Sequence, residues 1–252
     1  MVVVVRRDVQ AVLLILIGGA LLRISLTDMY LRYVKEALRP ALIAAGAVLL
    51  LVGLISAVRD GIQRRAEEPA TPAEAADDEH AGHDHSAGPR AAWLLCLPVL
   101  ALFLIAPPAL GSYTASRSNN VVAKPAAASN DAGFPALPPG DPLPMSLADF
   151  LIRSVWDTSA PLKDRNVQLT GFVTPGKAPG TWYVTRMVIS CCAADAFARK
   201  IEVHGAAAPP TDSWVTVTGR WLPNGQIQAD DAMPALTATK IDRIPAPKEP
   251  YE

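Results

Sequence analysis

The stretch SWVTVTGRW (Ser213–Trp221) determines the fold class of the second half of this chain. Apolar residues and a glycine at 215, 217, 219 and 221 alternate with polar residues at 216, 218 and 220. This period of two is typical of a β-strand with one buried face. The sequence PNG at 223–225 follows one residue later and predicts a turn at the end of this strand.

Four further segments near this stretch have the composition of strands. They are NVQLTGFV at 166–173, TWYVTRMVIS at 181–190, RKIEVHG at 199–205 and PALTATKIDRI at 234–244. Five strands within about 80 residues predict a small all-β barrel of the OB type, with an open sheet or a sandwich as the alternative. Ser146 precedes Asp149 by three residues, as in a capping box, and predicts a short helix just before the strands.

The first half of the chain contains three apolar segments, and we expect two to three transmembrane helices from them. The chain is 50% hydrophobic, and its mean hydropathy of +0.22 is high for a soluble domain. Asp8–Thr27, Pro40–Val58 and Ala91–Leu110 each approach the roughly 20 residues that span a bilayer core. For the first segment, a signal peptide with Arg6 and Arg7 as its basic region is the alternative.

The expected chain is therefore α+β, with transmembrane helices followed by a small OB-like barrel. Its expected divisions are a helical pair at 1–63, a His-rich and acidic linker at 64–90, a third helix at 91–110, a proline-rich stalk at 111–144 and the β domain at 145–252. The basic residues that flank the spans are equally divided between the two sides, so charge does not set the orientation. The polar stalk is typical of exported segments, and we expect a multi-pass cell-membrane protein with an extracytoplasmic β domain.

Two groups of residues are candidate metal ligands. The linker sequence DDEHAGHDH at 77–85 holds His80, His83 and His85, three of the four histidines in the chain. Imidazoles beside carboxylates suit zinc, nickel or copper, although a flexible segment would bind them weakly. A solvated acidic loop that contains histidines by chance is the alternative.

The second group surrounds the adjacent cysteines Cys191 and Cys192. They could be packing residues, ligands for zinc or Cu(I) together with Asp195 or His204, thiol-exchange groups, or partners in intermolecular disulfides. On a strand, the two side chains would point to opposite faces unless a turn brings both outward. The third cysteine, Cys96, lies in an expected membrane span and is not a reasonable partner.

Composition and motifs exclude several classes of function. The formal net charge of −1 and the lack of a basic stripe argue against a nucleic-acid partner. The chain has no C-x-x-C, G-x-S-x-G or H-E-x-x-H sequence and no phosphate-binding loop. We therefore do not expect an enzyme.

Several segments together resemble the YcgQ-type family of bacterial membrane proteins. They include APPALGSY at 106–113, LTGFV at 169–173, ISCCAADA at 189–196, WVTVTGRW at 214–221 and PYE at 250–252. The resemblance implies a permease subunit that works with a larger permease in the lipid bilayer. The expected function is that of an accessory subunit supporting transport of a small solute such as a divalent metal ion. The alternatives are a stand-alone metal-binding or metal-sensing membrane protein and a membrane-tethered thiol oxidoreductase.

Overall fold

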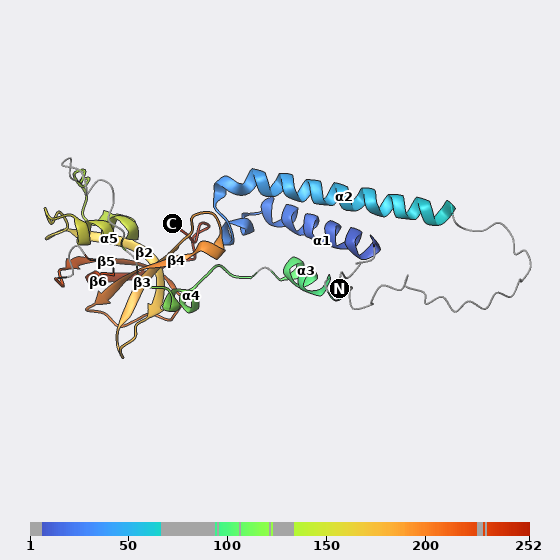
Figure 1. Cartoon of the computed structure of the whole chain (residues 1–252). Helices are drawn as coiled ribbons and strands as arrows, with labels where there is room; N and C mark the ends of the chain where they lie inside the picture. Colours follow the sequence, from blue (N-terminus) through green and yellow to red (C-terminus); the bar gives the residue numbers. More distant parts are fainter. Residues whose placement is uncertain are drawn as a thin grey trace, which may run out of the picture. The chain divides into compact units, whose positions relative to one another are not determined.

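The computed structural model of the chain forms two compact units. The structure describes residues 7–66, 94, 96–105, 107–120, 122, 134–225, 229 and 231–252. The first unit consists of Met1–Tyr30 and Glu36–Pro107, and the second of Leu31–Lys35 and Pro108–Glu252. Figure 1 shows the elements along the chain, from the helices of the first unit to the sheet of the second.

The first unit is helical. It contains α1 (Arg7–Ser25), η2 (Glu36–Leu38), α2 (Arg39–Ala66) and α3 (Cys96–Leu104), while η1 (Asp28–Arg32) spans the boundary with the second unit. In the described part of the chain, the helical segment Glu36–Gln63 is long and apolar enough to cross a membrane. The apolar segment Val9–Ser25 of α1 is helical too, but it is shorter.

Glycines allow α1 and α2 to approach each other closely. A Cβ atom added at Gly18 would lie 2.7 Å from the amide nitrogen of Leu50 and 2.8 Å from the carbonyl oxygen of Gly46. A Cβ atom at Gly53 would lie 3.0 Å from the amide nitrogen of Ile15. Both backbones therefore occupy the space that side chains would need. Small residues at such contacts are typical of helix pairs in membranes.

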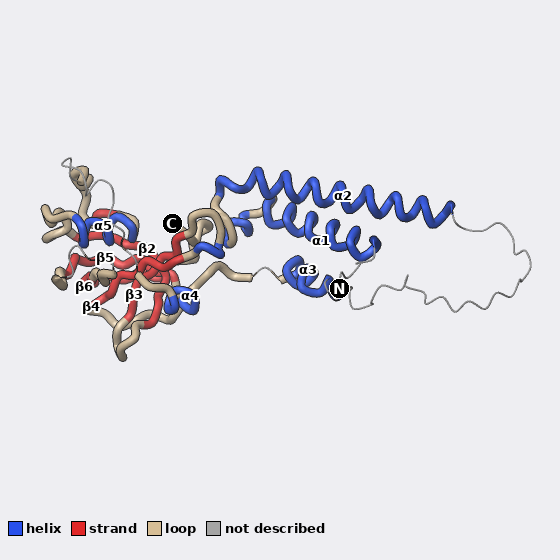
Figure 2. The backbone as a smooth tube through the Cα atoms, viewed as in Figure 1, coloured by secondary structure: helices blue, strands red, loops and turns tan. Residues whose placement is uncertain are grey.

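The second unit contains a six-stranded mixed sheet. Its strands are β1 (Leu143–Pro144), β2 (Asn166–Pro175), β3 (Trp182–Val188), β4 (Phe197–His204), β5 (Trp214–Leu222) and β6 (Ala235–Arg243). The strand order is β1-β2-β3-β4-β6-β5, and β2 also pairs with β5. Neighbouring strands are antiparallel except for the parallel pairs β1–β2 and β4–β6. The five expected strands are confirmed, and Figure 2 shows them gathered in red.

One face of the sheet packs into the main apolar core together with α5 (Leu147–Trp156). Trp182 and Leu169 of the strands and Phe150 of the helix are completely buried there. The expected cap of the helix is present, because the Ser146 hydroxyl accepts the N–H of Asp149 at 3.0 Å. The helix and its start are therefore confirmed.

The opposite face of the sheet is covered in part by α4 (Ser112–Arg117), which lies within the segment expected to be a stalk. Ala115 of this helix belongs to a second apolar cluster with Phe172 of β2 and Met187 of β3. Asn120 follows the helix and binds the backbone of β4, with its side-chain oxygen accepting the N–H of Lys200 at 3.0 Å. Residues 108–120 are thus part of the compact β unit rather than a free spacer, because they carry both apolar and hydrogen-bonding contacts to the sheet.

Candidate metal-binding site

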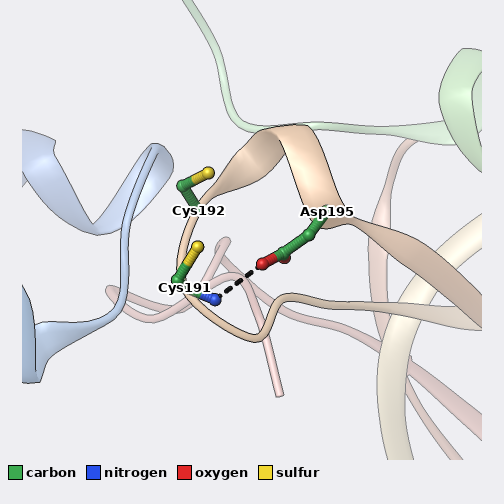
Figure 3. A group of neighbouring side chains, drawn as sticks. All are labelled: Cys191, Cys192 and Asp195. Carbon is green, nitrogen blue, oxygen red and sulfur yellow. Dashed lines mark hydrogen bonds between the residues drawn. The ribbon is translucent and has the colours of Figure 1, made fainter.

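The two adjacent cysteines lie in the loop between β3 and β4, next to the short 3-10 turn η5 (Ala193–Asp195). The carboxylate of Asp195 organises this loop, because its two oxygens accept the N–H groups of Ser190 and Cys191, both at 2.8 Å. The N–H of Asp195 in turn donates to the carbonyl of Cys192 at 3.1 Å. Figure 3 shows the carboxylate pointing back at the start of its own loop. The turn therefore folds on itself around one acidic side chain.

This folding brings three possible metal ligands together. The Sγ atoms of Cys191 and Cys192 and one carboxylate oxygen of Asp195 lie within 4.8 Å of one another. Cys191 is exposed, Cys192 is half-buried, and both are free thiols. The chain has left β3 at this point, so the strict alternation of a strand does not apply, and the two sulfurs lie near each other (Figure 3).

The carboxylate also sets the electrostatics of the loop. Hydrogen bonds from the backbone N–H groups of Cys191 and Ser190 lower the pKa of Asp195 to about 2. The hydrogen bond of the Cys191 thiol to this carboxylate, followed by its hydrogen bond to Cys192, raises the pKa of Cys191 to about 11. At neutral pH, Asp195 is therefore ionised and Cys191 is a protonated thiol. A protonated thiol is a poor nucleophile, but a metal ion can displace its proton.

A short segment from elsewhere in the chain pairs with the cysteine loop. Val34 forms an antiparallel bridge with Cys192. The N–H of Lys35 donates to the carbonyl of Cys191 at 3.2 Å, and the N–H of Ala193 donates to the carbonyl of Tyr33 at 2.7 Å. Residues 31–35, which connect α1 to α2 in the sequence, therefore form part of the wall of this site.

Tyr251 holds the same segment in place. Its hydroxyl donates to the carbonyl of Arg32 at 2.7 Å and accepts the N–H of Leu110 at 3.0 Å. Glu252 continues the contact, because its N–H donates to the carbonyl of Met187 in β3 at 2.9 Å. No role for Tyr251 or for residues 31–35 was predicted from the sequence. The motif PYE at 250–252 contains Tyr251 and could have drawn attention to it. Nothing in the local sequence indicated that its hydroxyl would contact Arg32 and Leu110.

The remaining candidate ligands are not part of this cluster. His204 lies at the far end of β4, an eight-residue strand that is about 23 Å long at the usual rise per residue. Its ring lies 3.2 Å from the carboxylate of Glu202. The linker histidines His80, His83 and His85 lie outside the described residues. The structure therefore joins Asp195, but not His204, to the two cysteines.

Comparison with known families locates the cysteine loop within a recognised domain. Residues 151–252 match the DUF1980 C-terminal domain. The match to the DUF1980 C-terminal domain includes β2 to β6 and the whole cysteine loop, and it begins within α5. No curated protein matches the chain. No solved structure matches it either.

Proposed function

We propose that the protein is a membrane-anchored accessory subunit of a permease whose β domain binds a soft or borderline metal ion. The site is Cys191, Cys192 and Asp195, and the ions that suit it are Cu(I) and Zn(II). The observation that carries this proposal is the convergence of two thiols and one carboxylate within 4.8 Å at an accessible loop. The transported solute would be the same kind of metal ion.

The spacing of the ligands is compatible with both ions. At a metal–sulfur distance of about 2.3 Å, a tetrahedral ion separates two sulfurs by roughly 3.8 Å and a linear ion by roughly 4.6 Å. Both separations lie within the 4.8 Å limit of the cluster. Three protein ligands leave a fourth position open on a tetrahedral ion, and an open position suits transfer to another protein better than permanent structural binding.

The β domain is proposed to be an OB-like barrel that presents this loop. Among the strands β2 to β6, each pairs with two others, since the pairing of β2 with β5 joins the two ends of their order, while β1 is added at one end of β2. A ring of five strands is the arrangement of a small closed barrel. The cysteine loop connects two adjacent strands of this ring.

The proposed location is a cell membrane, with α2 as one span and the shorter apolar helix α1 and the apolar segment 91–110, which contains α3, as further spans in a multi-pass arrangement. So few spans are insufficient for a pore, which favours a larger permease as partner. The β domain would lie on the extracytoplasmic side, where it meets metal ions before they reach the permease.

A stand-alone metal sensor is the second candidate function. The pairing of Val34 with Cys192 favours it, because residues 31–35 connect α1 to α2 in the sequence. An ion bound by the loop would alter the segment between two membrane helices. A thiol oxidoreductase is less favoured, since its nucleophile needs a lowered thiol pKa and Cys191 has a raised one.

The experiment is metal titration of the full-length protein in mild detergent, with zinc and Cu(I) each competed against a chromophoric chelator. We expect one site with a dissociation constant below about 1 μM, lost in the double variant Cys191→Ser/Cys192→Ser and retained in Cys96→Ser. A variant with alanine at His80, His83 and His85 separates any contribution of the linker. Unchanged titration of the double cysteine variant would overturn the metal site.

Affinity purification in the same detergent tests the accessory role. Co-purification of a larger membrane protein supports the permease subunit. A wild-type protein that binds metal but recovers no membrane partner favours the sensor instead.

A further inference from the structure

A second site lies in the β unit, away from the cysteine loop. A pocket of about 670 Å³ opens between the end of α4, the turn from β2 to β3 and the loop before β6. Its lining includes Thr174, Lys177, Tyr183, Lys200 and Asp231. The volume lies in the range of small-molecule sites.

Lys200 places a cationic group at the inner wall of this pocket. The residue is only 7% exposed. Its ammonium group donates to the carbonyl oxygens of Ala115 at 3.0 Å and of Ser118 at 2.6 Å. An ammonium group has three protons, so one donor position remains for a ligand.

Lys177 adds a second cation from the turn between β2 and β3. Burial lowers the pKa of Lys200, and the positive charge of Lys177 lowers it further. An anion between them would remove this repulsion. Asp231, on the loop before β6, contributes a carboxylate to the lining.

Thr174 provides an independent indication of a ligand. The residue is 1% exposed, and its hydroxyl has no hydrogen-bond partner among the described residues. A buried hydroxyl without a partner destabilises a fold, and nearly all such groups are satisfied in native proteins. Thr174 lines the pocket, but its hydroxyl oxygen is itself shielded from solvent, so a ligand oxygen becomes its partner only when a neighbouring side chain moves aside.

We propose that this pocket binds a small organic oxyanion. Its carboxylate or phosphate group lies between Lys177 and Lys200 and accepts the hydroxyl of Thr174. Asp231 then meets a hydroxyl or amino group of the same ligand. The site is independent of the metal site proposed above.

The test is isothermal titration calorimetry of the full-length protein in detergent, with three probes. Inorganic phosphate and succinate represent the two kinds of oxyanion, and glycerol is the neutral control. We expect phosphate or succinate to bind with a dissociation constant of about 1 mM or lower, and glycerol not to bind. The anion that binds more tightly shows whether the pocket prefers a phosphate or a carboxylate group.

Two variants assign the binding to this pocket. Lys177→Gln should weaken the anion at least fivefold, whereas Lys163→Gln, an exposed lysine outside the pocket, should leave it unchanged. Thr174→Val should weaken the anion while the Tm of the ligand-free protein stays the same or rises, because a hydroxyl without a partner is removed. Absence of binding by both anions, or equal binding by wild type and Lys177→Gln, would overturn the proposal. The variant Cys191→Ser/Cys192→Ser should bind the anion normally, which keeps this result separate from the metal site.

Discussion

The carboxylate of Asp195 accepts the backbone N–H of Cys191 at 2.8 Å and also raises the pKa of the thiol on that residue to about 11. One side chain therefore shapes the loop and keeps its exposed thiol protonated. This combination protects a free cysteine from oxidation and alkylation while leaving it available to a metal ion, since thiolates are the reactive species. A metal ion that binds this thiol must first displace its proton.

The first prediction concerns the reactivity of Cys191. In a Cys96→Ser/Cys192→Ser background, Cys191 is the single thiol, and its alkylation by iodoacetamide should rise with pH toward a midpoint above that of an ordinary cysteine. The variant Asp195→Asn removes the charge and should move the pKa back toward 9.0. Alkylation at pH 8 should then increase by up to about a hundredfold, since one pKa unit is a tenfold change in thiolate.

The matched control for this prediction is Asp164→Asn, which makes the same change at an exposed aspartate outside the cysteine loop. Asp164 has a positive φ of 60°. Asparagine tolerates that backbone conformation well. Equal alkylation rates in the background protein and in Asp195→Asn would show that the carboxylate does not control the thiol.

The second prediction is the pH dependence of metal binding. Asp195, with a pKa of about 2, is ionised throughout the range from pH 6 to 8 and adds no slope. The thiol of Cys191 must lose its proton to bind, and its raised pKa lies above this range. The association constant for zinc should therefore increase by at least about tenfold per pH unit from pH 6 to 8.

Histidine ligands would give a different profile, because an ordinary imidazole titrates near pH 6.5 and the slope would level off above about pH 7. Measurement in the variant with alanine at His80, His83 and His85 isolates the cysteine site. A profile that stays flat between pH 7 and 8 in that variant would show that thiolates do not bind the ion.

Much of the β unit can be predicted from the sequence because its signals are local. The alternation at 214–221 identifies β5, and the spacing of Ser146 and Asp149 identifies the start of α5. The position of α4 cannot be predicted in this way, since its contacts join residues about 80 positions apart, such as Asn120 and Lys200. Proline and small residues around it indicated a spacer instead.

The neighbours of the candidate metal site could not be predicted from local sequence patterns either. The sequence places Asp195 near the cysteines, but the role of its oxygens as acceptors of backbone N–H groups depends on the turn that they form. His204 is closer to the cysteines in the sequence than Val34 is, yet Val34 pairs with Cys192 and His204 lies at the other end of β4. Sequence distance therefore does not identify the neighbours of this loop.

The third prediction tests the contacts of Tyr251. Tyr251→Phe removes the hydrogen bonds to Arg32 and Leu110, and we expect the β unit to lose about 1–3 kcal/mol of unfolding free energy. Tryptophan fluorescence during chemical unfolding reports on this unit, which holds four of the five tryptophans at 156, 182, 214 and 221. Tyr113→Phe is the control, because Tyr113 is 72% exposed and should change stability little. Equal stability of the two variants would contradict the role of the Tyr251 hydroxyl.

The fourth prediction tests whether the segment around α4 belongs to the folded unit. The side-chain amide of Asn120 donates to the carbonyl of Ala232 at 2.9 Å, its oxygen accepts the N–H of Lys200 at 3.0 Å, and the residue is 6% exposed. Asn120→Ala leaves these buried groups without partners and should cost about 2–4 kcal/mol. The adjacent Asn119 is exposed, so Asn119→Ala should cost less than about 0.5 kcal/mol. Similar melting curves for the two variants would support a free spacer.

The fifth prediction concerns the packing of α1 against α2, where two adjacent glycines provide a matched pair. A Cβ atom at Gly18 meets backbone atoms of Leu50 and Gly46 at 2.7 and 2.8 Å, whereas a Cβ atom at Gly19 has nothing within 4 Å. Backbone atoms cannot rotate away as a side chain can, so Gly18→Ala must separate the helices. It should lower the stability of the helical pair by about 1–3 kcal/mol.

The substitution Gly19→Ala should leave the stability of the helical pair unchanged or raise it. Gly19→Ala adds a methyl group in open space and improves the helix propensity of α1, which is worth up to about 1 kcal/mol. Thermal unfolding followed by far-ultraviolet circular dichroism in detergent measures both variants under the same conditions. A lower Tm for Gly18→Ala together with an unchanged or higher Tm for Gly19→Ala is the expected result. The same shift for both would mean that Gly18 does not face α2, because helix propensity alone treats the two positions alike.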